Sequence, residues 1–290
     1  MGDAWHQPTE PAAHTRDLAT SAPVIGDTLP IMAGSIQRGD GRRACDVALD
    51  GVVAGRHHVA AASLVGLAHA VSGSSRQDAY SFCLDPRGRL YVAVADGLGS
   101  RSVSQLGARI FCDEIMRAAC ERDDDSPAEP ATLIAIAGRN TATITRDVYG
   151  QNPREVSCVA VVGAFGQERF EFARVGDATA FEFADAAFVE LFDNHSDFVN
   201  LVDAAIPEDN DRATTVTMTS RASVIALVTD GLATDIRSSE GVRTWLISQW
   251  AMPVTAYAMS ESLRYRRRGS HDDRTAVVVW TQIGVHDAPT

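Results

Sequence analysis

The chain has 290 residues, of which 45% are hydrophobic, so it can bury one large core. Its 38 acidic residues outnumber the 26 basic ones, and the net charge of −12 argues against binding to nucleic acid. Every basic residue is an arginine, which excludes a Walker phosphate loop, a kinase lysine and Schiff-base chemistry. Five cysteines without a Cys-x-x-Cys pair indicate reduced thiols rather than a disulfide framework or a zinc site.

The N-terminal region differs in composition from the rest of the chain. Residues 1–43 are rich in Pro, Gly, Ala, Ser and Thr and show no clear periodicity, which predicts a flexible N-terminal arm. Residues 44–290 are expected to form one domain. The sequence shows neither a signal peptide nor an apolar run long enough to cross a membrane, so we expect a cytoplasmic protein with no membrane contact.

Hydrophobic spacing predicts the elements of this domain. In chain order they are strands at 57–63, 79–84 and 90–95, helices at 102–122 and 130–149, four strands between 156 and 192, a polar excursion at 194–215, a strand at 222–229, helices at 239–250 and 254–267, and a strand at 275–283. This order does not alternate as repeated β-α-β units would. It predicts stacked sheets with a helix pair on each outer face, an α+β sandwich.

Aspartates stand at the ends of several predicted strands. Asp96 and Asp230 each leave a buried strand and precede a glycine, whereas Asp78 and the pair Asp272 and Asp273 enter one. Any one of these residues alone is typical of a turn. Carboxylates that meet at one edge of a sandwich would repel each other, and a divalent cation with oxygen ligands, Mg²⁺ or Mn²⁺, removes that difficulty. Two such ions could activate water and clamp a phosphoryl group.

Five blocks in this order and spacing carry a resemblance to a known family. QDAYSF, ADGLGS, VGDATAFEF, VTDGLATD and DDRTAVVV resemble the metal-dependent serine/threonine protein phosphatases of the PPM (type-2C) family, and residues 57–80 resemble the opening of a bacterial branch. The resemblance covers about residues 57–282. It implies an α+β fold, a four-layer αββα sandwich in which two central antiparallel β-sheets are flanked by helix pairs.

The resemblance also implies two bound Mn²⁺ or Mg²⁺ ions and their ligands. Asp96 matches the aspartate that bridges both metals, and Gly97 would offer its backbone carbonyl, which would explain a backbone without a side chain there. Asp230 and Asp272 match ligands of the first metal, and Asp273 falls where the family often has asparagine.

Catalytic roles follow from the same resemblance. Gln77 and Asp78 match a Glu/Gln-Asp pair that orients metal-bound water. Gly73 stands where well-characterised members carry a phosphate-binding arginine. The candidates for that role are His69, Arg76 and the arginines around Arg266. A protonated His69 could donate to a phosphoryl or leaving-group oxygen, and the alternative is that it only satisfies a loop carbonyl.

Other polar residues receive structural interpretations. Asp177 in the VGDATAFEF block is expected to shape a hairpin turn rather than to bind metal. The RYRRRG cluster at 264–269 is expected to be a solvated helix end. His57, His195 and His271 are single histidines without metal-ligand spacing, for which surface or core positions are expected. The GQNPRE block lacks a clear aspartate for the third metal of some members.

The main functional hypothesis is a metal-dependent protein serine/threonine phosphatase that hydrolyses phosphoserine or phosphothreonine by a metal-bridged water. A phosphorylated protein substrate, pairing with a serine/threonine kinase, and a monomeric state are expected. The departures at Gly73 and Gln77 leave open a catalytically weak or inactive regulator that binds a phosphoprotein partner. A metal-dependent hydrolase of a small phosphorylated molecule is the third hypothesis.

Overall fold

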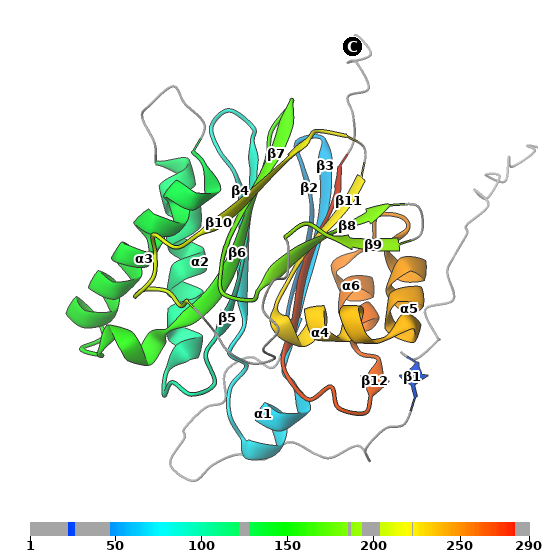
Figure 1. The fold of residues 1–290 in the computed structure, drawn as a ribbon, viewed down its shortest axis with the longest axis horizontal. Coiled ribbons are helices and arrows are strands. Elements are labelled where there is room, and N and C mark those ends of the chain that lie inside the picture. The colour runs from blue at the N-terminus through cyan, green and yellow to red at the C-terminus, as the bar shows by residue number, and fades with distance from the viewer. Residues whose placement is uncertain are drawn as a thin grey trace, which may run out of the picture.

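Two antiparallel β-sheets stack face to face, and helices cover both outer faces (Figure 1). The structure is a computed structural model that describes residues 23–26, 47–121, 128–184, 187–192, 204–221 and 223–281. Both sheets pair only antiparallel neighbours within these ranges. The predicted α+β sandwich of four layers is therefore confirmed.

One sheet has five strands in the order β10-β7-β6-β5-β4. Its strands are β4 (Ala79–Leu84), β5 (Leu90–Gly97), β6 (Cys158–Phe165), β7 (Arg169–Val175) and β10 (Thr214–Thr219). Helices α2 (Ser104–Cys120) and α3 (Pro130–Asp147) cover its outer face, as Figure 1 shows. The short 3-10 helix η1 (Pro153–Val156) leads into β6.

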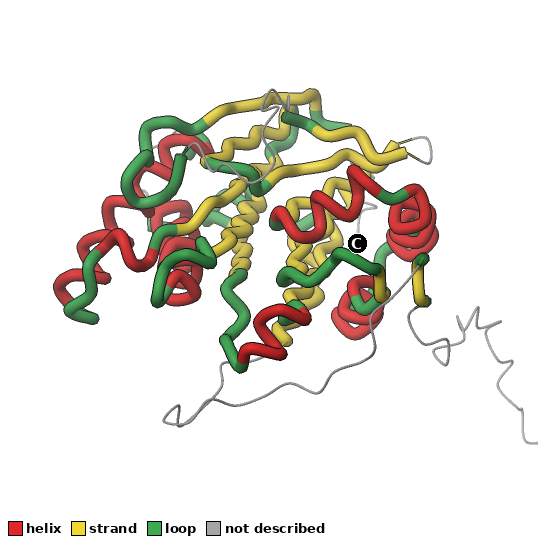
Figure 2. The backbone as a smooth tube through the Cα atoms, turned by 60° about the horizontal axis from the view of Figure 1, so that its bottom comes forward, coloured by secondary structure: helices red, strands yellow, loops and turns green. Residues whose placement is uncertain are grey.

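The other sheet has six strands in the order β2-β3-β13-β11-β8-β9. Its strands are β2 (Val47–Ala54), β3 (His57–Leu64), β8 (Thr179–Ala184), β9 (Ala187–Glu190), β11 (Ser223–Val228) and β13 (Arg274–Thr281). Its outer face is covered by α4 (Asp230–Ser238), α5 (Glu240–Trp250) and α6 (Ala256–Leu263). The small helix α1 (Leu67–Ser72) lies beyond the strand ends (Figures 1 and 2).

The alternation of side chains along β5 determines which face of this strand turns inward. Val92 and Val94 are fully buried between the two sheets, whereas Ala93 and Ala95 face α2 and α3. Full burial of an aliphatic side chain of valine size contributes about 1.5–3 kcal/mol. Because successive side chains of a strand point to opposite faces, Asp96 follows Val94 onto the face between the sheets.

Antiparallel pairing sorts the strand ends into two groups. The ends of β3, β5 and β11 lie at the same edge as the beginnings of β4, β6 and β13, and we call this the carboxylate edge because Asp78, Asp96, Asp230 and Asp272 stand there. The tight turns β2–β3, β4–β5 and β6–β7 lie at the opposite end, which we call the turn end. Residues 55–56, 85–89 and 166–168 form these turns.

Several elements differ from the sequence-based expectation. Helices α1 and α4 and strands β2 and β10 were not predicted, because α1 and α4 are only 6 and 9 residues long and most positions of β2 and β10 are exposed. The helix expected at 254–267 ends at Leu263. Arg266–Arg267 instead forms strand β12, so the interpretation of 264–269 as a helix end is wrong. Residues 194–203 of the excursion expected at 194–215 lie outside the described residues, and its last two residues belong to β10.

A short piece of the predicted arm docks on the domain. Strand β1 (Val24–Ile25) pairs in parallel with β12, and the Arg266 amide donates to the carbonyl of Pro23 at 3.1 Å. The Ile25 side chain packs against the core under α4 to α6. The expectation of a flexible arm is therefore wrong at residues 23–26, and the rest of 1–43 lies outside the described residues.

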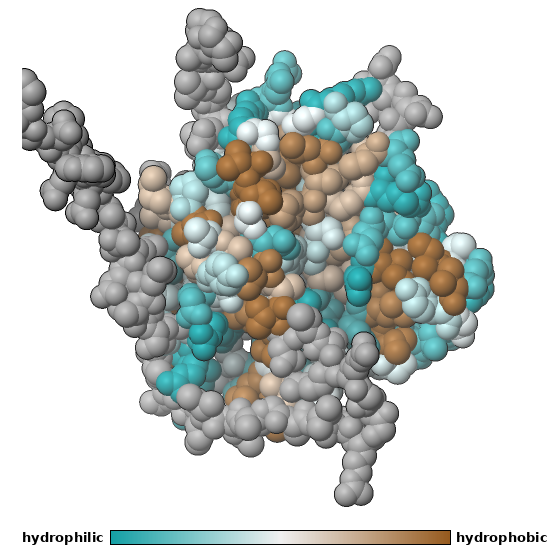
Figure 3. Space-filling view, turned by 180° about the vertical axis from the view of Figure 1, so that it is seen from behind, coloured by the Kyte–Doolittle hydropathy of each residue, from teal (hydrophilic) through white to brown (hydrophobic). Residues whose placement is uncertain are grey.

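Exposed large hydrophobic side chains come from separate elements, among them Val53 on β2, Val148 after α3 and Tyr257 on α6. The face shown in Figure 3 correspondingly mixes hydrophilic and hydrophobic areas. None of the described helices has the length and hydrophobicity required to span a membrane.

Truncations of the arm test the β1 contact. Removal of residues 1–22 leaves every described contact in place, so we expect an unchanged melting temperature. Removal of residues 1–46 also deletes the Ile25 contact, and we expect a loss of about 1 kcal/mol in the free energy of unfolding, measured by urea denaturation. Equal stability of the two truncated proteins would contradict a stabilising role of β1.

Candidate metal centre

The pairing of β4 with β5 brings the first two carboxylates together. Ala79 pairs with Ala95, so the next position of this register sets Asp78 opposite Asp96. Tyr80 and Val94, two residues further along each strand, belong to the core between the sheets. Asp78 and Asp96 therefore point between the sheets at the carboxylate edge.

Hydroxyl groups of the other sheet hold Asp78. Its Oδ2 accepts hydrogen bonds from Thr229 Oγ1 at 2.8 Å and from Thr275 Oγ1 at 2.6 Å. Only 4% of Asp78 is exposed, and both threonines are fully buried. The side chain of Asp78 thus links the five-stranded sheet to the ends of β11 and β13 in the six-stranded sheet.

Asp230 and Asp272 approach this pair from the six-stranded sheet. Asp230 begins α4 directly after Thr229, and Asp272 lies just before β13. Two glycines make room for the segment that carries Asp272: a Cβ on Gly66 would meet the backbone of Asp272, and one on Gly231 would meet the carbonyl oxygen of Asp273. Any larger residue at these glycines would push the Asp272 segment away.

Asp273 organises the loop that carries His69 and Gln77. This carboxylate is 2% exposed, and its Oδ1 accepts from the Gly66 amide at 2.7 Å and contacts His69 Nδ1 at 2.9 Å. Its Oδ2 accepts from the Gln77 amide at 2.6 Å. Sequence analysis gave Asp273 no role of its own, and its position next to Asp272 was the only available signal.

Burial and neighbouring charges raise the pKa of three of these carboxylates. Burial is the main cause of a pKa well above the ordinary value for Asp78 and Asp96, and the charges of neighbouring aspartates add to it. Burial, together with the charges of Asp177 and Asp272, raises the pKa of Asp230 to about 6. The four predicted carboxylates, Asp78, Asp96, Asp230 and Asp272, therefore lie in one electrostatic cluster.

Asp177 is a fifth member that sequence analysis left out. It lies in the turn between β7 and β8, after Gly176 with its φ of +81°. The turn crosses from the five-stranded to the six-stranded sheet, so the turn was expected correctly but the hairpin was not. Burial raises its pKa, and its charge in turn raises the pKa of Asp230. A turn position and a place beside the cluster are thus compatible.

The donor set fits a hard divalent cation. Asp230 Oδ1 is buried and has no hydrogen-bond partner within the described part of the chain. Burial of an unpaired carboxylate oxygen is costly, and a cation with oxygen ligands relieves that cost. Ligand atoms of His69, Asp272 and Asp273 also lie within 4.8 Å of one another, although His69 Nδ1 already contacts Asp273.

Gly97 has a packing reason to lack a side chain in addition to the predicted carbonyl role. A Cβ at this position would come within 2.8 Å of the backbone of Ser104, the first residue of α2. The close approach of α2 to β5 therefore requires glycine here. Whether its carbonyl also serves a metal stays a prediction.

Gly73 also has a conformational reason to replace the family's arginine. It ends α1 with a φ of +74°, in the left-handed region that favours glycine. Arg76 lies near Asp78 instead: its Nη1 donates to Ser63 Oγ at 2.5 Å and also contacts the Asp78 carbonyl. Arg266, the third candidate for phosphate binding, is exposed on β12.

A cavity of about 460 Å³ adjoins Asp78 on the side of α2. Arg76 and Arg109 line it together with Tyr80 and Asp113. Arg109 was not singled out by sequence analysis, because nothing in the helical spacing of α2 distinguishes it from a solvated arginine. The structure thus offers two arginines beside the carboxylate cluster.

Substitution of Asp96 tests the carboxylate cluster without any activity assay. In chelator, Asp96→Asn should melt at the same or a higher temperature than the unaltered protein, because one repelling charge is gone. Added Mn²⁺ should stabilise the unaltered protein, by about 2.7 kcal/mol at 100 times Kd, and should barely affect the variant. Asp147→Asn, at an exposed aspartate ending α3, is the matched control and should keep the Mn²⁺ response. A lower melting temperature of metal-free Asp96→Asn would instead assign Asp96 to the turn alone.

Comparisons with known proteins agree with this architecture. A search of curated protein sequences found no match. The fold is similar to the catalytic domain of the phosphatase PstP, solved with two manganese ions, at 18% identity and a TM-score of 0.58, covering 77% of this chain and 97% of that one. It is similar to a serine/threonine phosphatase of S. agalactiae at 15% identity and a TM-score of 0.59, covering 81% and 100%. RsbX, solved with magnesium, gives 16% identity and a TM-score of 0.54, covering 80% and 98%.

The sequence itself matches a family description. The description is "Protein phosphatase 2C", and the match extends over residues 65–265, more than half of the chain. This range contains the loop with His69 and Gln77, both Asp-Gly turns and the helices between them. The resemblance found from sequence is thereby confirmed, and the chain belongs to the protein phosphatase 2C family of metal-dependent protein phosphatases.

Proposed function

We propose that this chain hydrolyses phosphoserine and phosphothreonine in proteins with two Mn²⁺ or Mg²⁺ ions. The observation that carries the proposal is the cluster of Asp78, Asp96, Asp230 and Asp272 at the carboxylate edge, with a buried, unpartnered oxygen on Asp230. Membership of the protein phosphatase 2C family supports it. The solved relatives with bound manganese or magnesium support the choice of ion.

Asp96, Asp230, Asp272 and the Gly97 carbonyl are the groups that would hold the ions. Two divalent ions there would supply a nucleophilic water near neutral pH and neutralise phosphoryl oxygens. Asp78 would orient that water, and its two threonine hydrogen bonds would fix the carboxylate in one direction. Gln77, whose backbone N–H donates to Asp273, would help to orient the same water from this loop.

Arginine is the proposed phosphate ligand, since the chain has no lysine. Arg76 and Arg109 line the cavity next to Asp78, and a guanidinium group can bind two phosphate oxygens at once. Arg76 also contacts the backbone of Asp78, so its position depends on the same loop as the proposed catalytic groups. Arg109 extends from α2, a rigid element.

His69 is the proposed proton donor to the leaving oxygen. The hydrogen bond to Asp273 raises the pKa of His69, which favours the protonated imidazole. About 18% of the side chain is exposed, so the ring remains reachable from the carboxylate edge. Asp273 therefore acts as a positioning residue for both His69 and Gln77.

The biological setting remains part of the proposal. The substrate would be a protein that a serine/threonine kinase of the same cell has phosphorylated. We expect a monomer in the cytoplasm. The catalytically weak regulator, which would bind a phosphoprotein without turnover, is the alternative outcome of the following experiment.

Hydrolysis assays with defined metals test the proposed activity. We expect release of phosphate from a phosphothreonine peptide and from p-nitrophenyl phosphate with Mn²⁺ or Mg²⁺, and no release in EDTA, because loosely held oxygen-ligated ions are removed by chelation. Asp96→Asn should be inactive on both substrates. A protein that is stabilised by Mn²⁺ yet hydrolyses neither substrate would be the regulator rather than the enzyme.

The leaving group distinguishes a proton donor from a phosphate ligand at His69. For His69→Ala we expect kcat/KM on phosphothreonine to fall by about 10²-fold, a usual contribution of a general acid. The loss on p-nitrophenyl phosphate should be much smaller, because nitrophenolate leaves without a proton. Equal losses on both substrates would assign His69 to phosphate binding or to loop structure.

A further inference from the structure

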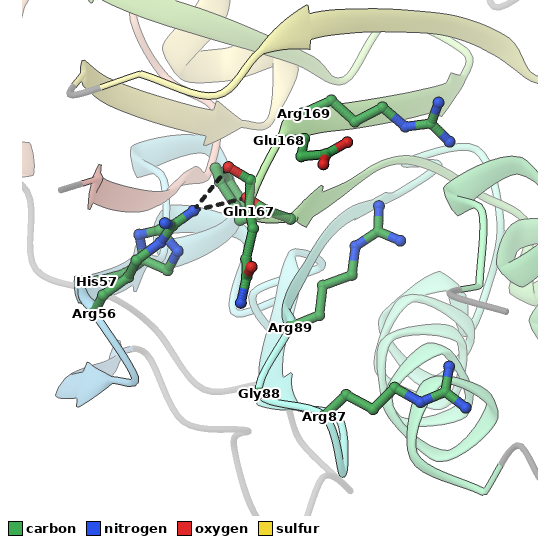
Figure 4. Close-up of a pocket in the computed structure, with 10 residues that line it drawn as sticks. Arg56, His57, Arg87, Gly88, Arg89, Gln167, Glu168 and Arg169 are labelled. Atoms are coloured by element: carbon green, nitrogen blue, oxygen red, sulfur yellow. Dashed lines mark hydrogen bonds between the residues drawn. The ribbon is translucent and has the colours of Figure 1, made fainter. Parts of the chain in front are cut away.

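The turn end of the sandwich carries a pocket whose charge differs from that of the whole protein. The cavity has a volume of about 730 Å³ and lies between the turns β2–β3, β4–β5 and β6–β7 (Figure 4). Arg56, Arg87, Arg89 and Arg169 line it, with Glu168 as the acidic residue of the wall. A chain with a net charge of −12 thus gathers four guanidinium groups around one opening.

The pocket is held in place from several elements. Arg56 Nη2 donates to the Gly166 carbonyl at 2.8 Å and to Ser220 Oγ at 3.3 Å, which joins the β2–β3 turn to the β6–β7 turn. Gly55 and Gly88 have φ values of +59° and +79°, so tight turns bring the backbone around the opening. Figure 4 shows Arg56 with His57 on one side of the pocket and the other three arginines on the other.

Glu171 offsets only part of the charge. Its carboxylate pairs with Arg169 Nη2 at 2.9 Å and also with Arg89. Among the residues that line the pocket, four are arginines and one, Glu168, is acidic. The side chain of Arg89 is 11% exposed, and its Nε is buried with no hydrogen-bond partner within the described residues.

His57 provides a second unsatisfied group in the wall. It is 2% exposed, and its Nδ1 has no hydrogen-bond partner within the described residues. The rings of Phe165 and Phe170 lie 6.0 and 6.4 Å from it, centroid to centroid. Burial and the charge of Arg56 lower the pKa of His57 to about 4, so the imidazole is neutral around neutral pH. Buried polar groups without partners in a folded protein call for an explanation, and a bound ligand is one.

We propose that this turn-end pocket binds a small molecule with a diphosphate group, at a site separate from the metal centre. Each guanidinium group can donate two hydrogen bonds to the oxygens of one phosphate. Four such groups offer more donors than a single phosphate can accept from, which favours a diphosphate. The volume lies within the usual range for small-molecule sites and leaves room for an organic part, as in a nucleoside diphosphate. Leu90 and Asp96 lie at opposite ends of β5, so roughly 20 Å separates the two sites.

Binding of pyrophosphate to the metal-free protein tests the proposal. Chelator removes the metal ions from the carboxylate edge and leaves Arg76 and Arg109 there beside uncompensated aspartates, which repel an anion. The assay needs neither metal nor turnover, so an independent failure of the phosphatase function would not affect it. We expect saturable binding at one site by calorimetry, with an affinity that falls as salt rises. ADP in place of pyrophosphate should bind at least as well, and tighter binding of ADP would show that the nucleoside also contacts the pocket.

The double variant Arg87→Gln, Arg169→Gln should bind pyrophosphate about tenfold more weakly or worse, because two charge-assisted contacts are lost. Both side chains are exposed, and surface ion pairs such as Arg169–Glu171 contribute little, so the melting temperature without ligand should change only slightly. Should the double variant be unstable, Arg87→Gln alone serves, with a smaller loss expected. Arg139→Gln, Arg146→Gln on α3 makes the same change of charge away from the pocket and should bind normally.

Two results would overturn the proposal. One is the absence of pyrophosphate binding to the metal-free protein at millimolar concentrations. The other is equal weakening in the pocket variant and the α3 control, which would reduce the effect to overall charge.

His57→Phe keeps the ring among Phe165 and Phe170 but removes both nitrogens, and it should weaken binding without loss of fold.

Discussion

The hydrogen bonds from Thr229 and Thr275 to Asp78 connect the two sheets at the edge where the carboxylates meet. Asp230 follows Thr229 directly, and Asp272 precedes Thr275 by three positions, so the same bonds locate both of these aspartates relative to Asp78. Because Asp78 is opposite Asp96 in the register of β4 and β5, a shift of either sheet would separate the whole set. The stacking of the two sheets and the geometry of the site therefore depend on the same contacts.

This arrangement trades stability for function. Burial and neighbouring charges raise the pKa of Asp78, Asp96 and Asp230, so in the absence of metal the free energy of unfolding is lower than it would be with amides or threonines at these positions. Close approach also requires residues without side chains, namely Gly66, Gly97 and Gly231, which lose more backbone entropy on folding than other residues. A bound cation would turn the repulsion between the carboxylates into attraction to the ion, so cation binding and stability are expected to be coupled here.

The two ends of the sandwich carry opposite charge for a topological reason. Antiparallel hairpins send every strand between the same two edges, so residues that start or end strands gather in two places. Asp78, Asp96, Asp230 and Asp272 gather in one place, and the four arginines of the turn-end pocket gather in the other, across the length of β5. A chain whose basic residues are all arginine handles anions with planar, always charged groups that bind in pairs of hydrogen bonds.

The sequence by itself determined the sandwich, the family and the four aspartates of the carboxylate edge, because strand alternation and the position of aspartates at strand ends are local properties of the chain. It did not determine α1, α4, β2 or β12, which are short or exposed and owe their conformation to what they pack against. Nor did it indicate that Asp273 holds the loop of His69 and Gln77, or that arginines from around three turns meet at one pocket. Those contacts join residues far apart in the chain, and only the stacking of two sheets brings them within reach of one another.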